Sequence, residues 1–219
     1  MTFSLLARDP QSGALGGAAV TGNLCVGAWV LRGRPGVGIS ASQGHYPSTL
    51  WGENVLDEMR SRVETDRAIK NTVAPDGGRA FRQLVALSQY GQGGAFSGQG
   101  NVAQVSHLIQ ADVCSAGNML TTTRVVEAAV DGYRAASGSL LRRLLNGLEF
   151  GAAEGGDVRG LMSAAVLIVA VDHPPIDLRI DFSTDPLGDL ANLVARVEKE
   201  DYVRWMQALP TREGPFPTH

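Results

Sequence analysis

The sequence predicts an α+β protein in which strands and helices form separate layers. Short apolar or alternating segments, bounded by turns rich in glycine and proline, indicate strands. Segments with apolar residues three and four positions apart indicate amphipathic helices. The two kinds of segment occur in blocks rather than in strict alternation, and this order favours antiparallel sheets over one parallel sheet. No internal repeat or linker divides the chain, so we expect one domain over residues 1–219, with a tail from about residue 208.

The first block is expected to be a set of short strands joined by tight turns, which implies an antiparallel sheet. In its first segment Phe3, Leu5 and Ala7 alternate with mixed residues, so one face should be apolar. The four strands of this block are expected at residues 2–8, 15–20, 25–31 and 37–42. Pro47 suits the first position of a helix, which is expected to extend to about residue 62.

The rest of the chain continues the pattern of grouped strands and helices. Strands are expected at residues 81–87, 94–97, 163–172 and 176–182, the last two forming a hairpin through His173-Pro174-Pro175. Helices are expected at residues 68–71, 120–136, 139–150 and 189–207.

Composition excludes several functional classes. A net charge of −3 and a pI near 5.8, without a basic cluster, argue against nucleic-acid binding. The most apolar stretch, residues 164–171, is far too short to cross a bilayer, and no basic segment with an apolar run begins the chain, so we expect a cytoplasmic protein. Cys25 and Cys114 lack metal-binding spacing and are expected to be buried thiols. No metal or other cofactor is implied, because ligand spacings and a glycine-rich nucleotide motif are absent.

Thr2 is the first candidate for catalysis. It is small enough for Met1 to be removed, which would place a hydroxyl and a free α-amine on one terminal residue. An α-amine, with a reference pKa of roughly 7.7–8.0, can act as the base that a threonine hydroxyl needs to become a nucleophile. Most chains that begin Met-Thr have no such activity, so the hypothesis depends on the sequence that follows.

That sequence resembles a known family. The segments MTFSLLARDPQSGALG, PGVGISASQG, FRQL, AFSG, GNML, GGDxRGxxSAA and LRIDFSTDPLGDL occur in the order and spacing of domain-of-unknown-function family 1028, a branch of the N-terminal nucleophile (Ntn) hydrolases. The resemblance covers residues 1 to about 193 and implies a four-layered αββα sandwich of two antiparallel sheets. It further implies a small-molecule amidohydrolase with Thr2 as nucleophile and base.

The resemblance also suggests other site residues. In the superfamily, the segment after the fourth strand commonly supplies a backbone N–H to the oxyanion, and here it is Gln43-Gly44-His45. Gly44 is the expected oxyanion donor, and Gln43 and His45 are expected to contact substrate. Asn118 suits an oxyanion donor or a helix N-cap equally well.

Three further candidates lie elsewhere in the chain. Thr21 and Asn23 occupy a place that orients the nucleophile in other Ntn enzymes, or they form a turn. His107 matches a family histidine and is a candidate for substrate contact, although a lone histidine is more often packed or on the surface.

Two charged pairs are expected to be structural. Arg8 and Asp9 could form a salt bridge at the far end of the sheet, and Asp157 and Arg159 could fix a glycine-rich loop or hold a substrate carboxylate. The chain has Asn101, Gln104 and Ala116 where the family pattern has a cysteine, a tryptophan and a glutamine. The resemblance therefore does not transfer a substrate, which could be a linear amide, a lactam, a ureido compound or a short peptide.

Two alternatives remain open. A hydrolase that retains Met1 could use Ser42 or Ser163, although no GxSxG motif supports this. A non-catalytic binding or assembly module could retain the same sandwich. Tyr202 and Trp205, before the C-terminal tail, could pack in a homodimer.

Overall fold

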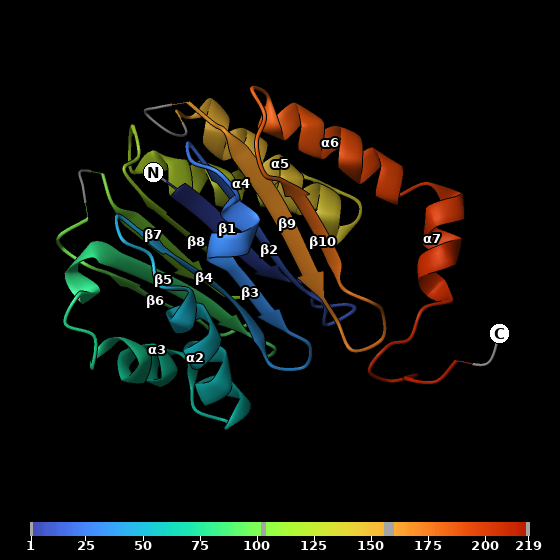
Figure 1. Cartoon of the computed structure of the whole chain (residues 1–219), viewed down its shortest axis with the longest axis horizontal. Helices are drawn as coiled ribbons and strands as arrows, with labels where there is room; N and C mark the ends of the chain where they lie inside the picture. Colours follow the sequence, from blue (N-terminus) through green and yellow to red (C-terminus); the bar gives the residue numbers. More distant parts are fainter. Residues whose placement is uncertain (1, 102–103, 156–159, 218–219) are drawn as a thin grey trace.

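Two antiparallel sheets stack face to face between layers of helices (Figure 1). The computed structural model describes residues 2–101, 104–155 and 160–217. The larger sheet has six strands in the order β10 (Ile176–Ile180), β9 (Ser163–Val169), β2 (Leu15–Thr21), β1 (Thr2–Arg8), β8 (Val113–Asn118), β7 (Ser106–Gln110). The smaller sheet has four in the order β3 (Leu31–Arg34), β4 (Gly38–Gly44), β5 (Arg82–Ser88), β6 (Gly93–Ser97).

Helices cover the outer face of each sheet (Figure 1). The six-stranded sheet packs against α4 (Arg124–Ala135), α5 (Leu140–Ala153) and α6 (Pro186–Val197). The four-stranded sheet packs against α2 (Thr49–Arg60) and α3 (Thr65–Val73). The predicted α+β class and the αββα sandwich are therefore confirmed. Two short helical segments, α1 (Val26–Val30) and η1 (Arg79–Phe81), lie in connections.

The alternating sequence of β1 determines where Thr2 lies. Phe3, Leu5 and Ala7 belong to the core under α4 and α5, whereas Leu6 belongs to the core between the sheets. Because alternate side chains of a strand point to opposite faces, Thr2 lies on the same face as Leu6, toward the second sheet. β1 is central and pairs with β2 and β8, so Thr2 stands opposite both Thr21 and Asn118.

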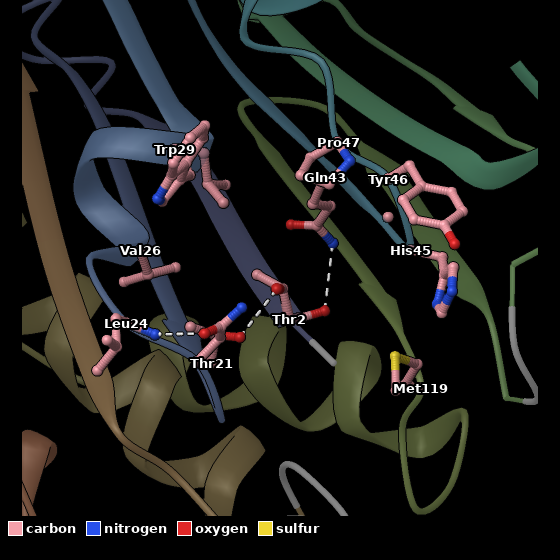
Figure 2. A pocket seen from close by; sticks show the side chains of 13 residues that line it. Thr2, Thr21, Leu24, Val26, Trp29, Gln43, His45, Tyr46, Pro47 and Met119 are labelled. Carbon is pink, nitrogen blue, oxygen red and sulfur yellow. Dashed lines mark hydrogen bonds between the residues drawn. The ribbon is translucent and has the colours of Figure 1, made fainter. Parts of the chain in front are cut away.

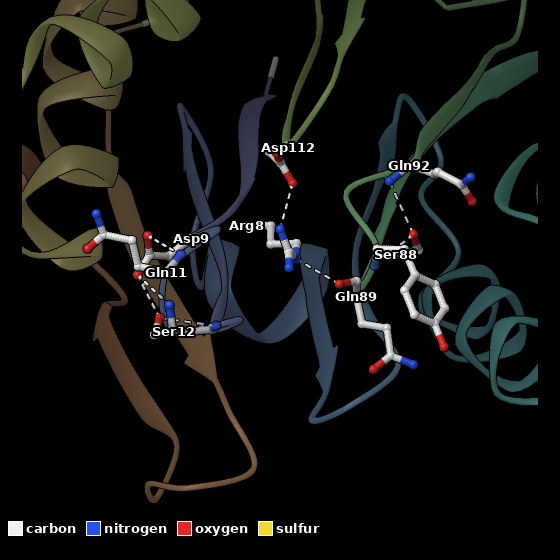
Figure 3. Close-up of polar contacts among 10 residues, drawn as sticks. Arg8, Asp9, Gln11, Ser12, Ser88, Gln89, Gln92 and Asp112 are labelled. Atoms are coloured by element: carbon white, nitrogen blue, oxygen red, sulfur yellow. Dashed lines mark hydrogen bonds and ion pairs between the residues drawn. The ribbon is translucent and has the colours of Figure 1, made fainter.

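Arg8 joins the two sheets at the opposite end of β1 (Figure 3). Its guanidinium donates to the backbone oxygen of Gln89, after β5, at 2.7 Å and forms an ion pair with Asp112 at 3.1 Å. The expected Arg8–Asp9 pair is wrong, because Asp9 instead accepts hydrogen bonds from the backbone and hydroxyl of Ser12. These bonds, led by that of the hydroxyl, lower the pKa of Asp9.

The prediction of a strand at residues 25–31 is wrong. Cys25 adopts a left-handed conformation with φ of 57°, and its carbonyl accepts from the N–H groups of Ala28 and Trp29, which starts α1. The segment is rich in apolar and β-branched residues and so is typical of a strand, but Val26 and Val30 are buried four positions apart, which is the helical period. The first four expected strands consequently do not form one sheet.

Other boundaries also differ from the prediction. β7 and β8 were not predicted, because β8 consists mainly of small and polar residues, VCSAGN, without a strand-like apolar pattern. The single helix expected at residues 189–207 is two helices, α6 and α7 (Glu200–Gln207), and α6 begins early because the Asp185 side chain caps it. The helix expected from residue 120 begins only at Arg124, and α2 begins at Thr49 rather than at Pro47.

The C-terminal helix α7 leaves large apolar side chains at the surface. It lies beyond the edge strand β10 in Figure 1, and none of its residues is buried. Tyr202 and Trp205 are both exposed, with ring centroids 5.2 Å apart. A homodimer through these residues stays a prediction.

Candidate functional site

A cavity of about 480 Å³ lies at the start of β1, between α1 and the segment that follows β4 (Figure 2). It is lined by Thr2, Thr21, Asn23, Leu24, Val26, Trp29, Val30, Gln43, Gly44, His45, Tyr46, Pro47 and Met119. The structure thus brings together six of the eight residues proposed from sequence. The two that it does not place in the lining are Asn118 and His107.

The Thr2 side chain is partly exposed and is oriented by β2. Its Oγ1 lies 3.1 Å from Oγ1 of Thr21, to which it donates a hydrogen bond. Thr21 is nearly fully buried and faces Thr2 directly in the ladder between β1 and β2. Asn23, two residues further on, accepts from the Leu24 N–H through Oδ1 at 2.9 Å, which fixes the loop beside the cavity.

Gln43 connects Thr2 to the second sheet. Its Nε2 donates to the backbone oxygens of Thr2 at 3.3 Å and Ala116 at 3.1 Å, and to Oε1 of Gln83 at 2.8 Å. Because all three partners are acceptors, the amide nitrogen must face them. Gln43 Oε1 is buried on the other side and has no hydrogen-bond partner among the described residues.

Gln83 is the central residue of this network, and sequence reasoning missed it. Its Nε2 donates to the backbone oxygens of Ser106 and Gly117, at 3.0 and 3.2 Å, and to Oγ of Ser97 at 2.9 Å. A long polar side chain inside the apolar segment RQLVALS was the available signal, since such a residue needs buried partners.

Asn118 belongs to the same network rather than to the cavity wall. Its Nδ2 donates to Gln83 Oε1 at 3.3 Å, and its side chain is buried between the sheets. This placement does not support the expected oxyanion donor. The alternative N-cap role is wrong, because Asn118 ends β8 and the next helix, α4, is preceded by Thr123.

Replacing Gln83 with leucine is expected to reduce the free energy of unfolding by about 3 kcal/mol, because it leaves several buried polar groups unpaired. Gln11→Leu is the matched control, since Gln11 lies exposed in a turn, and it should change stability by less than about 0.5 kcal/mol. Urea unfolding followed by circular dichroism measures both. Equal stability of the two variants would show that the network contributes little.

Gly44 ends β4 where two segments of backbone approach closely. Its φ is +132°, and an added Cβ would lie 2.5 Å from the carbonyl oxygen of Phe81 and 2.8 Å from Cα of Arg82. The next two N–H groups are engaged, because His45 N–H donates to Asn101 Oδ1 at 3.0 Å and Tyr46 N–H donates to the Phe81 oxygen at 3.2 Å. The Gly44 N–H is the remaining candidate donor in this segment.

The two candidate histidines have different surroundings. The His45 ring lies in the cavity wall and contacts Tyr46 edge-on, with ring centroids 4.5 Å apart (Figure 2). His107 lies on β7 outside the lining, with Nδ1 2.9 Å from Ser97 Oγ. That hydroxyl also accepts a hydrogen bond from Gln83 Nε2, so Ser97 joins His107 to the buried network. Partial burial lowers the pKa of His107, consistent with a neutral ring that supports the network from outside.

The alternative nucleophiles are buried and do not line the cavity. Ser42 Oγ donates to the backbone oxygen of Ser48 at 2.7 Å, and Ser163 Oγ donates to that of Asn23 at 2.7 Å. Both hydroxyls therefore have structural partners, and neither residue lines the cavity. Asp157 and Arg159, the other open assignment, lie outside the described residues.

The two thiols, Cys25 and Cys114, do not line the cavity. Burial raises the pKa of Cys114 to about 12, which keeps it protonated, while Cys25 is partly exposed. Within residues 2–101, 104–155 and 160–217, no three His, Cys, Asp or Glu side chains form a group that could hold a metal ion. The helices in the same described parts are too short or too polar to cross a membrane.

The fold and the site define an αββα sandwich with a threonine at the head of a central strand, facing a cavity of ligand size. This is the arrangement that the resemblance to Ntn hydrolases implied. The chain belongs to the family of unknown function DUF1028, whose model matches residues 2–190.

A solved structure from this family is similar over almost the whole chain. A crystal structure of a DUF1028 protein from Silicibacter pomeroyi is 40% identical, with a TM-score of 0.93, over 98% of this chain and 97% of that one. Eukaryotic HslV from Trypanosoma brucei is 12% identical with a TM-score of 0.49, over 77% of this chain and 99% of its own. Anbu (ancestral beta-subunit) from Yersinia bercovieri is 14% identical with a TM-score of 0.46, over 95% of this chain and 98% of its own. No curated protein matches the chain.

Proposed function

We propose that this protein hydrolyses a small-molecule amide, with Oγ1 of Thr2 as nucleophile after removal of Met1. The observation that carries the proposal is the position of Thr2, which is the second residue of the chain and faces a cavity of about 480 Å³. A cavity of this volume suits a small molecule. The hydroxyl is held by Thr21, and the backbone is held by Gln43, so the nucleophile has a defined orientation.

The α-amine of Thr2 is the base in this mechanism. It takes the hydroxyl proton as Oγ1 attacks the carbonyl carbon, and the resulting ammonium gives a proton to the leaving nitrogen as the C–N bond breaks. Water then attacks the threonyl ester while the amine accepts a proton from it. That proton passes to Oγ1 as the ester C–O bond breaks, which releases the carboxylic acid and restores the Thr2 hydroxyl. Overall, amide and water give acid and amine.

The composition of the cavity lining favours the α-amine as base, because few other side chains there could accept a proton. None of the described residues around the cavity is Asp, Glu, Lys or Arg, and His45 is the one histidine among them. The oxyanion that forms during the attack needs an N–H donor within hydrogen-bond distance. Gly44 is the proposed donor, since the N–H groups of His45 and Tyr46 are already bonded to other residues.

Inserting one alanine between Met1 and Thr2 tests the mechanism, because it keeps the hydroxyl but converts the amine of Thr2 into an amide. A β-lactone electrophile, whose carbonyl resembles that of an amide, should acylate the wild type at Thr2. We expect the insertion to reduce the labelling rate at least about 100-fold, the lower end of what a general base contributes. Intact mass and peptide mapping measure the adduct and also show whether Met1 is removed.

Three results would contradict the proposal. They are unchanged labelling of the insertion variant, labelling at another residue, and full retention of Met1 in a protein that still reacts. Ligand binding without labelling or amide turnover would instead favour the non-catalytic module.

A further inference from the structure

Three large apolar side chains that the fold leaves exposed line the Thr2 cavity. Leu24, Trp29 and Tyr46 are 47%, 55% and 61% exposed, and all three line it. Exposed apolar side chains that line one cavity suit a binding site, because a ligand can remove their surface from water. In Figure 2, Trp29 and Tyr46 lie on either side of Thr2.

The backbone behind Trp29 is firmly anchored. Val26 and Val30 of α1 are buried in the core between the sheets. The Val26 N–H donates to Ser163 Oγ at 3.1 Å, and the Cys25 N–H donates to the Asp181 oxygen at 3.0 Å. The helix therefore presents Trp29 outward from a fixed base, and the indole has no ring contact with another described aromatic residue.

The backbone behind Tyr46 is anchored as well. Its N–H donates to the Phe81 oxygen, and its own oxygen accepts from the Arg82 guanidinium. The guanidinium is held in turn by an ion pair with Asp76 at 2.8 Å. The Tyr46 ring packs edge-on against Phe81, with centroids 5.9 Å apart, so this wall of the cavity is also aromatic and fixed.

The lining between these walls is uncharged. None of its described residues is Asp, Glu, Lys or Arg, and its polar groups are hydroxyls, amides and the His45 ring. A charged substituent packed against Trp29 and Leu24 would lose hydration without gaining an ion pair from any described lining side chain, which is unfavourable. An aromatic or aliphatic group would instead cover Trp29 and Leu24.

We propose that the substrate is a neutral amide carrying a flat aromatic or apolar group, which packs against Trp29 and Leu24 while its carbonyl lies at Thr2. This inference rests on the proposed function, because it takes the Thr2 cavity as the substrate site. It narrows the substrate class by excluding amides with a carboxylate or an ammonium on that group.

Binding to the Thr2→Ala variant tests this without any turnover. Three probes of similar shape are measured by isothermal calorimetry, namely 4-methylphenylacetamide, 4-carboxyphenylacetamide and 4-(aminomethyl)phenylacetamide. We expect the neutral probe to bind at least about tenfold more tightly than either charged probe, because only the charged groups must be desolvated.

A second substitution assigns the contact to Trp29. In the same background, Trp29→Ala should lower the affinity for the neutral probe about tenfold, because an aromatic contact and the apolar area that it covers are lost. Trp205→Ala is the matched control, since Trp205 is 54% exposed but lies on α7 outside the cavity, and it should leave affinity unchanged. Equal effects of the two substitutions, equal or tighter binding of a charged probe, or no binding of the neutral probe would each overturn the proposal.

The binding and labelling experiments distinguish failure of the substrate class from failure of the proposed function. If Thr2 is not a nucleophile, the β-lactone labelling fails, while selective binding at Trp29 is still observed. If the substrate class is wrong, labelling at Thr2 persists and the binding preference is absent.

Discussion

Thr2→Ala is expected to abolish acylation by a β-lactone, reducing the labelling rate at least about 1,000-fold, because removal of a nucleophile is the most severe loss a catalytic site can suffer. The variant keeps a small residue after Met1, so the α-amine should still be exposed. Thr2 is partly exposed at the cavity, so the fold should be retained. Intact-protein mass spectrometry over time measures the rate, and circular dichroism confirms folding.

Two further variants separate the hydroxyl from its surroundings. Thr2→Ser keeps the hydroxyl and should retain measurable labelling. Thr21→Val removes the acceptor 3.1 Å from Thr2 Oγ1 and should slow labelling about five- to tenfold, the value of about one hydrogen bond. If Thr2→Ala reacts as fast as the wild type, the nucleophile lies elsewhere.

Gly44→Ala is expected to have the largest effect on stability, lowering the free energy of unfolding by about 4 kcal/mol. Two costs combine in this variant. A φ of +132° is strained for any residue with a Cβ, and that Cβ would lie within 3 Å of backbone atoms of Phe81 and Arg82. Since backbone cannot move aside as a side chain can, the β4–β5 edge must shift, and the Thr2 site with it. Urea unfolding and the labelling rate measure the two consequences.

Gly13→Ala is the control for conformational strain alone. Gly13 has φ of +73° in the turn after β1, and no atom lies within 4 Å of an added Cβ. The free energy of unfolding of this variant should fall by only about 1 kcal/mol, and its labelling rate should be unchanged. A loss at Gly44 no larger than that at Gly13 would show that the close approach of the Phe81 segment is not restrictive.

The sequence correctly predicts the helices and strands whose apolar residues recur with a single local period. The alternation of Phe3, Leu5 and Ala7 correctly identifies β1 and places Thr2 on the opposite face. Residues 25–31 were misread because a short apolar helix and a strand share the same composition. β8 was missed because its small residues suit the crowded layer between sheets but carry no periodic signal.

The residues of the candidate site also differ in whether the sequence could identify them. Thr2, Thr21 and the Gln43-Gly44-His45 segment came from chain position and family resemblance, and the structure places all of them at one cavity. Gln83 was missed because its role arises from contacts with both sheets, to Gln43 across one ladder and to Gly117 across the interface. Such contacts join residues far apart in sequence, and no local pattern records them.

The contacts of Thr2 have a consequence for how the chain end behaves. Terminal residues of most domains fray, because one flanking neighbour is missing and solvent competes for their hydrogen bonds. Thr2 is instead held laterally by two strands, by the Thr21 hydroxyl and by the Gln43 amide from the other sheet. After the proposed removal of Met1, the new terminus would therefore have little conformational entropy left to lose. The geometry that the proposed mechanism requires would then exist before any substrate arrives.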